Sequence, residues 1–421
     1  MGGGSDAPRQ LAIAIGLLAI AAAAVAVDVA TDASIVIAVT GVVIAITASA
    51  GLFVGANGLA SLAPESAARR IRPWIFVGPA LIFVGAALVV PTIRTVYLSM
   101  LSDEPDNEDG FVFLENFQTI FTEDDLFSTE GLSDMFTSRL FFIGLVALCA
   151  TVAVARINGR RVGVGFDSTS PLAMVGFAAA GTFFLFALFS SASGVIWNNL
   201  WWVFAVTAIA TGLGLAVAVL ADQTKGEAIA KSLIFTPMAI SFVGSSIIWR
   251  FVYAFRPQTS EQIGLLNAFW RGLGGDVFDP LQRGPWNTFF LIVVLIWAQT
   301  GFAMVVLSSA IKAVPDEYTE AARVDGATDA QIFWRITLPQ IRSTVLVVVT
   351  TLIILVMKVF DIVKVMTNGE FGTNVIANEM FDQSFRFGNP GLGAALATVL
   401  FVAVLPIMYF NIRRVREEAE L

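Results

Sequence analysis

The sequence predicts an all-α membrane protein that crosses the bilayer about ten times, and three observations carry this prediction. Of the 421 residues, 57% are hydrophobic and only 14% are charged, against about a quarter in ordinary soluble domains. Apolar runs of about 20 residues recur along the whole chain, and the mean hydropathy is +0.79. Because backbone polar groups in lipid must be paired within their own segment, such runs form helices rather than barrel strands.

Ten apolar segments are long enough to cross a bilayer as helices. They are expected at residues 11–27, 35–56, 74–97, 139–155, 172–190, 195–221, 231–254, 287–311, 343–363 and 392–411. Only a short Ser-Ala-Ser-Gly turn separates 172–190 from 195–221.

Lysine and arginine gather at four places at the ends of these segments. They are Arg69, Arg70 and Arg72; Arg156, Arg160 and Arg161; Lys225 and Lys231; and Arg413, Arg414 and Arg416. Cytoplasmic loops carry an excess of such residues. Ten spans with both termini cytoplasmic put all four groups on that side, which predicts a multi-pass protein of the cell membrane. The loop at 312–342 is then cytoplasmic, and 101–138 and 256–286 lie outside.

The net charge of −8 comes mainly from one loop. Eleven acidic residues and no basic residue lie between Leu101 and Ser138. A solvated outward loop is expected there, with a specific cation site as the alternative. The chain has no histidine and one cysteine, Cys149, so it lacks the commonest general base and the commonest metal ligand. We therefore predict no catalytic residue, no metal site and no enzyme activity.

A polar segment from Glu317 to Pro339 lies between two long apolar runs. Pro315 can open a helix with acidic residues in its first turn. Residues 325–327, Asp-Gly-Ala, predict a sharp bend, since glycine adopts backbone angles that other residues avoid. A second helical stretch is expected after Thr328, Asp329 and Ala330, and it ends at Pro339. Small residues would let another protein approach closely, so a docking loop is favoured over an amphipathic helix on lipid headgroups.

These residues resemble the EAA coupling motif of the permease subunits of binding-protein-dependent ABC importers. The motif consists of Glu-Ala-Ala, Asp-Gly-Ala, an aromatic residue and Ile-x-Leu-Pro. Its counterparts here are Glu320-Ala321-Ala322, Asp325-Gly326-Ala327, Phe333, Ile336 and Leu338-Pro339. The likeness covers most of the chain from about residue 74, through phrases such as FLENFQTIF and MTNG. Others, such as KVFDIVKVMTNGEFGTNVIANEMF, resemble the subgroup that moves α-glucosides such as maltose, trehalose and sucrose.

The resemblance implies a six-helix type I importer core within residues 73–412. Its helices are expected at 74–97, 195–221, 231–254, 287–311, 343–363 and 392–411. Residues 1–72 would add two N-terminal spans, and 98–194 an outward acidic loop with a two-helix insertion. Residues 313–340, named here the coupling segment, would be the cytoplasmic coupling loop, and 413–421 a cytoplasmic tail.

By this resemblance the coupling segment docks into a groove on a cytoplasmic ATPase. The contact would be made by Glu320, Ala321, Ala322, Asp325, Gly326 and Ala327. ATP and Mg²⁺ would be bound by a dimer of that ATPase and no cofactor by this chain, which has no Gly-x-x-x-x-Gly-Lys-Ser/Thr phosphate loop. The other implied partners are a second, different permease subunit, an extracytoplasmic sugar-binding protein, the sugar and membrane lipid, with no nucleic acid.

The resemblance also implies which residues would line the path of the sugar. In the maltose-type permease, contacts follow the tryptophan of the helix before the coupling loop, which here gives Ala298, Gln299 and Phe302. An amide and an aromatic face suit a sugar. Further contacts lie midway along the next helix. Their counterparts are Leu352, Leu355, Val356 and Val359, all apolar where the maltose-type pattern has Ser and Asn.

Polar residues inside spans are costly and mark a pathway or a helix contact. The candidates are Asn198, Asn199, Asn287, Gln299, Thr300, Thr350, Thr351, Lys358 and Asp361. Lys358 and Asp361 are three residues apart, so we expect a structural ion pair on one helical face rather than a sugar contact. The alternative functions are an ABC importer for a polyol or glycerol phosphate and an ion-coupled secondary transporter, which would favour midplane carboxylates and paired repeats.

Overall fold

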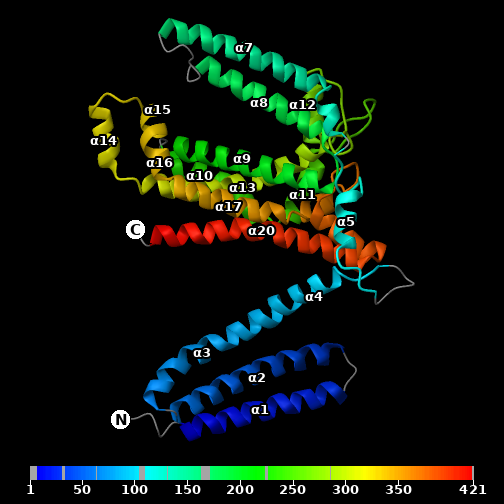
Figure 1. The fold of residues 1–421 in the computed structure, drawn as a ribbon, viewed down its shortest axis with the longest axis vertical. Helices are drawn as coiled ribbons and strands as arrows, with labels where there is room; N and C mark the ends of the chain where they lie inside the picture. The colour runs from blue at the N-terminus through cyan, green and yellow to red at the C-terminus, as the bar shows by residue number, and fades with distance from the viewer. Residues whose placement is uncertain are drawn as a thin grey trace. The chain divides into compact units, whose positions relative to one another are not determined.

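The computed structural model describes residues 7–30, 34–62, 64–103, 110–129, 131–162, 171–222, 226–284 and 286–419. These residues form helices joined by turns, with two isolated β-bridges, so the predicted all-α class is confirmed. The chain forms two compact units, Met1–Arg94 and Thr95–Leu421 (Figure 1).

The N-terminal unit consists of helices that pack through small residues. Its elements are α1 (Ala7–Ala30), α2 (Ser34–Leu62), α3 (Glu65–Val84) and the π-helix η1 (Gly85–Val89), and α4 (Val90–Leu98) continues into the second unit. Helices α1 and α2 lie side by side (Figure 1). A Cβ atom added to Gly51 would lie 3.0 Å from Cγ of Leu18. Glycine therefore lets these two apolar helices approach closely, as in other membrane helix pairs.

The second unit holds the remaining helices. Between the acidic loop and the polar segment they are α5 (Glu115–Thr122), α6 (Leu132–Met135), α7 (Arg139–Val162), α8 (Pro171–Ser191), α9 (Val195–Asp222), α10 (Glu227–Phe235), the 3₁₀-helix η3 (Thr236–Ala239), α11 (Phe242–Val252), α12 (Leu265–Gly272) and α13 (Asn287–Lys312). After them come α14 (Asp316–Val324), α15 (Asp329–Ile332), the π-helix η4 (Phe333–Thr337), α16 (Leu338–Gln340), α17 (Arg342–Met357), α18 (Asp361–Met366), α19 (Ile376–Asp382), the π-helix η5 (Gln383–Phe387) and α20 (Pro390–Ala419).

Helix α13 forms the centre of this unit and packs against α9 and α17. Trp202 of α9, Leu291 and Met304 of α13, and Leu352 of α17 are fully buried. In its most apolar part, 67% of the α13 residues are buried, against 39% in α9 and in α20. A helix buried over most of its length is held by packing against its neighbours, which makes α13 suited to carrying movement along the bundle.

The acidic loop anchors the first turn of α20. The carboxylate of Asp103 accepts hydrogen bonds from the backbone N–H groups of Gly391 at 2.6 Å and Leu392 at 2.7 Å. Asn116 of α5 donates to the carbonyl oxygen of Leu101 at 2.8 Å. Unpaired N–H groups at a helix start need acceptors, and a negative charge there is favourable. This part of the loop is therefore packed structure and not only a solvated surface.

The two ends of the second unit carry different elements. Helices α14, α15 and α16 lie at one end, where α20 also ends, and α5 and α12 lie at the other (Figure 1). The first is called here the coupling end. This arrangement agrees with the prediction that 312–342 and the C-terminal tail share one side of the membrane while 101–138 and 256–286 share the other.

Among the described residues, five helices are long and apolar enough to cross a membrane, or seven if two bent helix pairs each count as one span. The number ten is therefore not confirmed, although each predicted segment falls mainly on helix. The predicted span 231–254 is bent, because α10 and η3 meet α11 at an angle of 103°. Pro237 lies in η3, shortly before the bend, and Ser241 caps the start of α11 by accepting a hydrogen bond from the N–H of Gly244 at 3.1 Å.

The predicted span 343–363 is also interrupted, because α17 ends at Met357 and α18 begins at Asp361. Lys358 and Asp361 therefore do not share one helical face, and among the described contacts no ion pair joins them. The predicted structural pair is wrong. Lys364 pairs instead with the buried Asp382, at 2.7 Å.

Candidate functional site

The coupling segment begins with α14, whose ends follow the helix dipole. Asp316 and Glu317 lie in its first turn and Arg323 in its last. The chain then turns at Gly326, which has a φ of +82°. Another residue there would cost about 1–2 kcal/mol of backbone strain, although an added Cβ atom would meet nothing within 4 Å. The predicted helix and sharp bend are therefore both present.

A capping box holds the second half of the segment. The hydroxyl of Thr328 accepts from the N–H of Gln331 at 3.3 Å, and the Gln331 side chain accepts from the N–H of Thr328 at 2.8 Å. Helices α15, η4 and α16 follow, up to a bend of 68° before α17. Ile332 and Thr337 are buried. This half packs on the bundle, whereas α14 contains no buried residue.

The residues predicted to contact an ATPase lie together on α14 and the bend after it. They are Glu320, Ala321, Ala322, Asp325, Gly326 and Ala327, of which Ala322 and Ala327 are half-buried and the others exposed. Two apolar side chains beside them are also open to solvent: Val324 is 88% exposed and Tyr318 is 55% exposed. No described part of the chain buries these two side chains, so the tip has the composition of a surface that another protein would cover.

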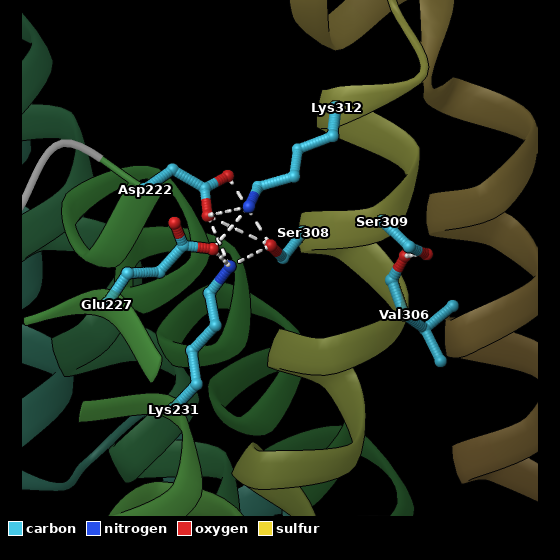
Figure 2. A network of polar contacts seen from close by, with 7 residues as sticks. All are labelled: Asp222, Glu227, Lys231, Val306, Ser308, Ser309 and Lys312. Atoms are coloured by element: carbon cyan, nitrogen blue, oxygen red, sulfur yellow. Dashed lines mark hydrogen bonds and ion pairs between the residues drawn. The ribbon is translucent and has the colours of Figure 1, made fainter. Parts of the chain in front are cut away.

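Five residues join the ends of α9, α10 and α13 where the coupling segment begins, and they are called here the ionic cluster (Figure 2). Lys231 of α10 contacts Asp222 at the end of α9, Glu227 at 2.7 Å, and Ser308 of α13. Lys312, the last residue of α13, contacts Glu227 and lies 3.9 Å from Asp222. The Ser308 hydroxyl donates to Asp222 at 3.0 Å.

The ionic cluster ties three helix ends together. The side chains of Asp222 and Lys231 are only 15% and 17% exposed, so water screens their attraction less than at an open surface. Lys312 precedes Asp316, the first residue of α14, by four positions. A displacement of the coupling segment would therefore pull on the ends of α9, α10 and α13 together.

A cavity of about 540 Å³ lies between α13, α17 and the bend from α10 to α11. Its lining residues are Met238, Ile240, Ser241, Phe242, Gln299, Phe302, Thr351, Leu352, Leu355 and Asp361. A second cavity of about 400 Å³ shares Phe242, Thr351, Leu355 and Asp361 with it, so the two adjoin. Small-molecule sites typically enclose about 300–1,000 Å³, and irregular backbone at membrane depth is tolerated where it lines such a cavity.

Five of the seven predicted pathway residues line these two cavities. They are Gln299, Phe302, Leu352, Leu355 and Val359. Ala298 and Val356 line neither; they are 1% and 0% exposed, and Val356 packs in the main core.

Three of the polar candidates instead hold the backbone that follows α18. Asn198 donates to the carbonyl oxygens of Gly372, at 2.7 Å, and Asn374, at 3.0 Å. Asn287 donates to the carbonyl oxygen of Phe371 at 2.7 Å. Asn199 accepts from the N–H of Ile376 and donates to the carbonyl oxygen of Met357. Buried backbone groups need such partners, so these asparagines are structural.

Gln299 differs from the three asparagines. It is 4% exposed and lines the larger cavity, and no described hydrogen bond uses its side-chain amide. An amide can donate two hydrogen bonds and accept two, so this group is free to bind a polar molecule in the cavity.

Sequence reasoning missed the cavity wall formed by the bend between α10 and α11. Ser241 and Phe242 belong to it. The signal was present: Pro237 interrupts an apolar run, and a serine three residues before Gly244 fits a helix start. Among the described residues, no group of three or more His, Cys, Asp or Glu side chains could hold a metal ion.

Comparison with known proteins identifies relatives along most of the chain. Residues 208–416, which include the coupling segment and all residues of the larger cavity, match the family described as binding-protein-dependent transport system inner membrane component. The chain is 42% identical over 347 residues to the osmoprotective compounds uptake permease protein GgtC of Synechocystis sp., covering 82% of this chain and 100% of that protein. It is 39% identical over 353 residues to the alpha-glucoside transport system permease protein AglF of Rhizobium meliloti, covering 84% of each.

Two further comparisons agree with these. The chain is 30% identical over 221 residues to the trehalose/maltose transport system permease protein MalF of Thermococcus litoralis, covering 51% of this chain and 72% of that protein. A solved bacterial ABC transporter involved in the import of the acidic polysaccharide alginate shares the fold, with a TM-score of 0.57 and 18% identity over 83% of this chain and 98% of that one. The chain is therefore a multi-pass membrane protein that belongs to the inner membrane components of binding-protein-dependent transport systems, the permease subunits of ABC importers.

Proposed function

We propose that this chain is the permease subunit of an ATP-driven importer of α-glucosides such as maltose, trehalose or sucrose. The observation that carries the proposal is that one helix, α13, connects an exposed EAA-type segment to a cavity with a free amide. The likeness to an alpha-glucoside permease and to a trehalose/maltose permease supports the substrate class.

The distance along α13 suits this coupling. Gln299 and Lys312 are 13 residues apart on one helix, which corresponds to about 20 Å at 1.5 Å per residue. Because two thirds of the apolar part of α13 is buried against neighbouring helices, we expect it to move with them rather than to bend alone. The ionic cluster extends this rigid connection to α10, whose bend into α11 forms another wall of the cavity.

The partners follow from this mechanism. The coupling end faces the cytoplasm, with both termini on that side, and Glu320, Ala321, Ala322, Asp325, Gly326 and Ala327 contact an ATPase dimer that binds ATP and Mg²⁺. A second permease subunit completes the translocation path, and an extracytoplasmic binding protein delivers the sugar. This chain itself catalyses no reaction.

A second candidate substrate class has one specific observation in its favour. The relative with 42% identity is named for uptake of osmoprotective compounds. A small polyhydroxyl solute would also fit cavities of about 540 and 400 Å³. Under this alternative the chain imports a compatible solute instead of a nutrient glucoside, and its coupling to the ATPase is the same.

Uptake by a reconstituted complex tests the proposal. The chain is purified with its partner permease and ATPase, placed in liposomes and supplied with the binding protein outside and ATP inside. Radiolabelled maltose, trehalose and sucrose are compared with a polyol. We expect ATP-dependent uptake of at least one α-glucoside that stops when the ATPase or the binding protein is left out. Uptake that persists without ATP and follows a proton or sodium gradient would contradict the proposal.

A further inference from the structure

We propose that Asp361 selects the substrate of this permease by accepting hydrogen bonds from the hydroxyl groups of an uncharged sugar. The inference rests on the proposed import of a polyhydroxyl compound and adds the residue and the charge that would discriminate among such compounds.

Asp361 lies where the two cavities adjoin. It follows the break between α17 and α18 and is one of four residues that line both adjoining cavities, so it lies where they meet. Gln299 lines the larger of the two. A molecule that fills the larger cavity would therefore meet an amide and a carboxyl-bearing residue.

Two other acidic or amide side chains of this part of the bundle already have partners, whereas Asp361 does not in the part of the chain that the structure describes. Asp382 binds Lys364, and Asn199 binds backbone groups of Met357 and Ile376. Asp361 has no ion pair or side-chain hydrogen bond among the described contacts. Ionisable residues within membrane segments are rare, and they face a water-filled cavity or a partner. Among the described residues Asp361 has no such partner, so we infer that its carboxylate faces the cavity.

The chemistry indicates the kind of ligand. A carboxylate only accepts hydrogen bonds, and its two oxygens can take two neighbouring hydroxyl groups at once. Lys358 lines the smaller cavity together with Asp361, so the charges of these two side chains sum to zero there. A neutral polyhydroxyl ligand fits this balance. A saccharide with its own carboxylate would be repelled at Asp361, since like charges in a site of low polarity oppose each other.

The test compares variants at Asp361 with a matched acidic residue away from the cavities. Asp361→Asn keeps the size and removes the charge, and Asp361→Ala removes both. Glu370→Gln is the control, because Glu370 is exposed in the turn after α18 and lines neither cavity. Each variant is reconstituted with the ATPase, the partner permease and saturating binding protein. Uptake of the α-glucosides that the wild type imports, basal ATPase activity and melting temperature are then measured.

We expect Asp361→Ala to lower the uptake rate roughly 10- to 100-fold, because hydrogen bonds to a charged group are lost. Asp361→Asn should lower it less, and Glu370→Gln should stay within about twofold of the wild type. All variants should keep basal ATPase activity, complex assembly and melting temperature, which a merely structural role would alter.

Two results would overturn the inference while leaving the proposed function intact. One is wild-type uptake by both Asp361 variants. The other is loss of assembly with the partner permease in Asp361→Asn, which would make the carboxylate a subunit contact. A wild-type complex without ATP-driven uptake would instead contradict the proposed function itself.

Discussion

Replacing Lys231 by methionine tests the ionic cluster, because Lys231 contacts both acidic residues and Ser308. Among the described contacts, the carboxylate of Asp222 then keeps the Ser308 hydroxyl at 3.0 Å and the Lys312 ammonium at 3.9 Å. An exposed pair contributes about 0–1 kcal/mol, and breaking a fully buried pair costs about 3–5 kcal/mol. With side chains 15–32% exposed, we expect a loss of about 2 kcal/mol.

The assay is thermal unfolding of the purified chain in detergent, followed by the fluorescence of its nine tryptophans. At roughly 1–2 °C per kcal/mol for a chain of 421 residues, Lys231→Met should melt about 2–4 °C below the wild type. Asp222→Asn combined with Lys231→Met should recover part of this loss, because no buried charge is then left alone.

The matched control is Arg323→Met on α14. Arg323 pairs with Asp329 at 3.7 Å, but their side chains are 64% and 88% exposed, so this variant should melt within about 1 °C of the wild type. Equal melting temperatures for Lys231→Met and Arg323→Met would refute the reasoning that the cluster braces the coupling end.

Two further variants test packing and anchoring. Gly214→Ala should lower the melting temperature by several degrees, because the new Cβ atom would lie 2.5 Å from that of Ala303 and force α9 away from α13. The control is Gly212→Ala on the same helix, whose new Cβ atom meets nothing within 4 Å and should leave the stability unchanged or slightly higher. Equal losses of melting temperature in the two variants would contradict the close approach of α9 and α13. Asp103→Asn should lower the free energy of unfolding by about 1–2 kcal/mol, because an amide cannot accept hydrogen bonds from both N–H groups at the start of α20 as a carboxylate does. Limited proteolysis should then cut the acidic loop faster than in the wild type. An unchanged rate of cleavage would contradict the anchoring role of Asp103.

The coupling segment was predictable because its signals are local. Pro315, the acidic first turn, Gly326 and Thr328 each set the backbone within a few residues, and each has the expected place in the structure. The all-α class followed equally directly from apolar run length. Such features need no knowledge of distant parts of the chain.

The cavity could be predicted only in part, because its form depends on contacts far apart in sequence. Asn198 and Asn199 looked like pathway residues, yet their partners lie more than 150 positions away and make them structural. Lys358 and Asp361 looked like a helical pair, yet the helix breaks between them. Hydropathy does not reveal such a break, since Val359 and Phe360, which lie between the two helices, are themselves apolar.

The central claim is that the coupling segment transmits the work of an ATPase, and Gly326→Arg tests it most directly. Gly274 is the matched control: its φ is +85° against +82° for Gly326, neither added Cβ atom would meet anything within 4 Å, and Gly274 follows α12 at the opposite end. Both changes therefore cost the chain a similar backbone strain, about 1–2 kcal/mol.

The measurement is substrate-stimulated ATP hydrolysis by the reconstituted complex, with co-purification of the ATPase as the readout of assembly. The account predicts that Gly326→Arg abolishes both, while Gly274→Arg keeps both near the wild-type level. Full stimulation and assembly with Gly326→Arg would contradict the account.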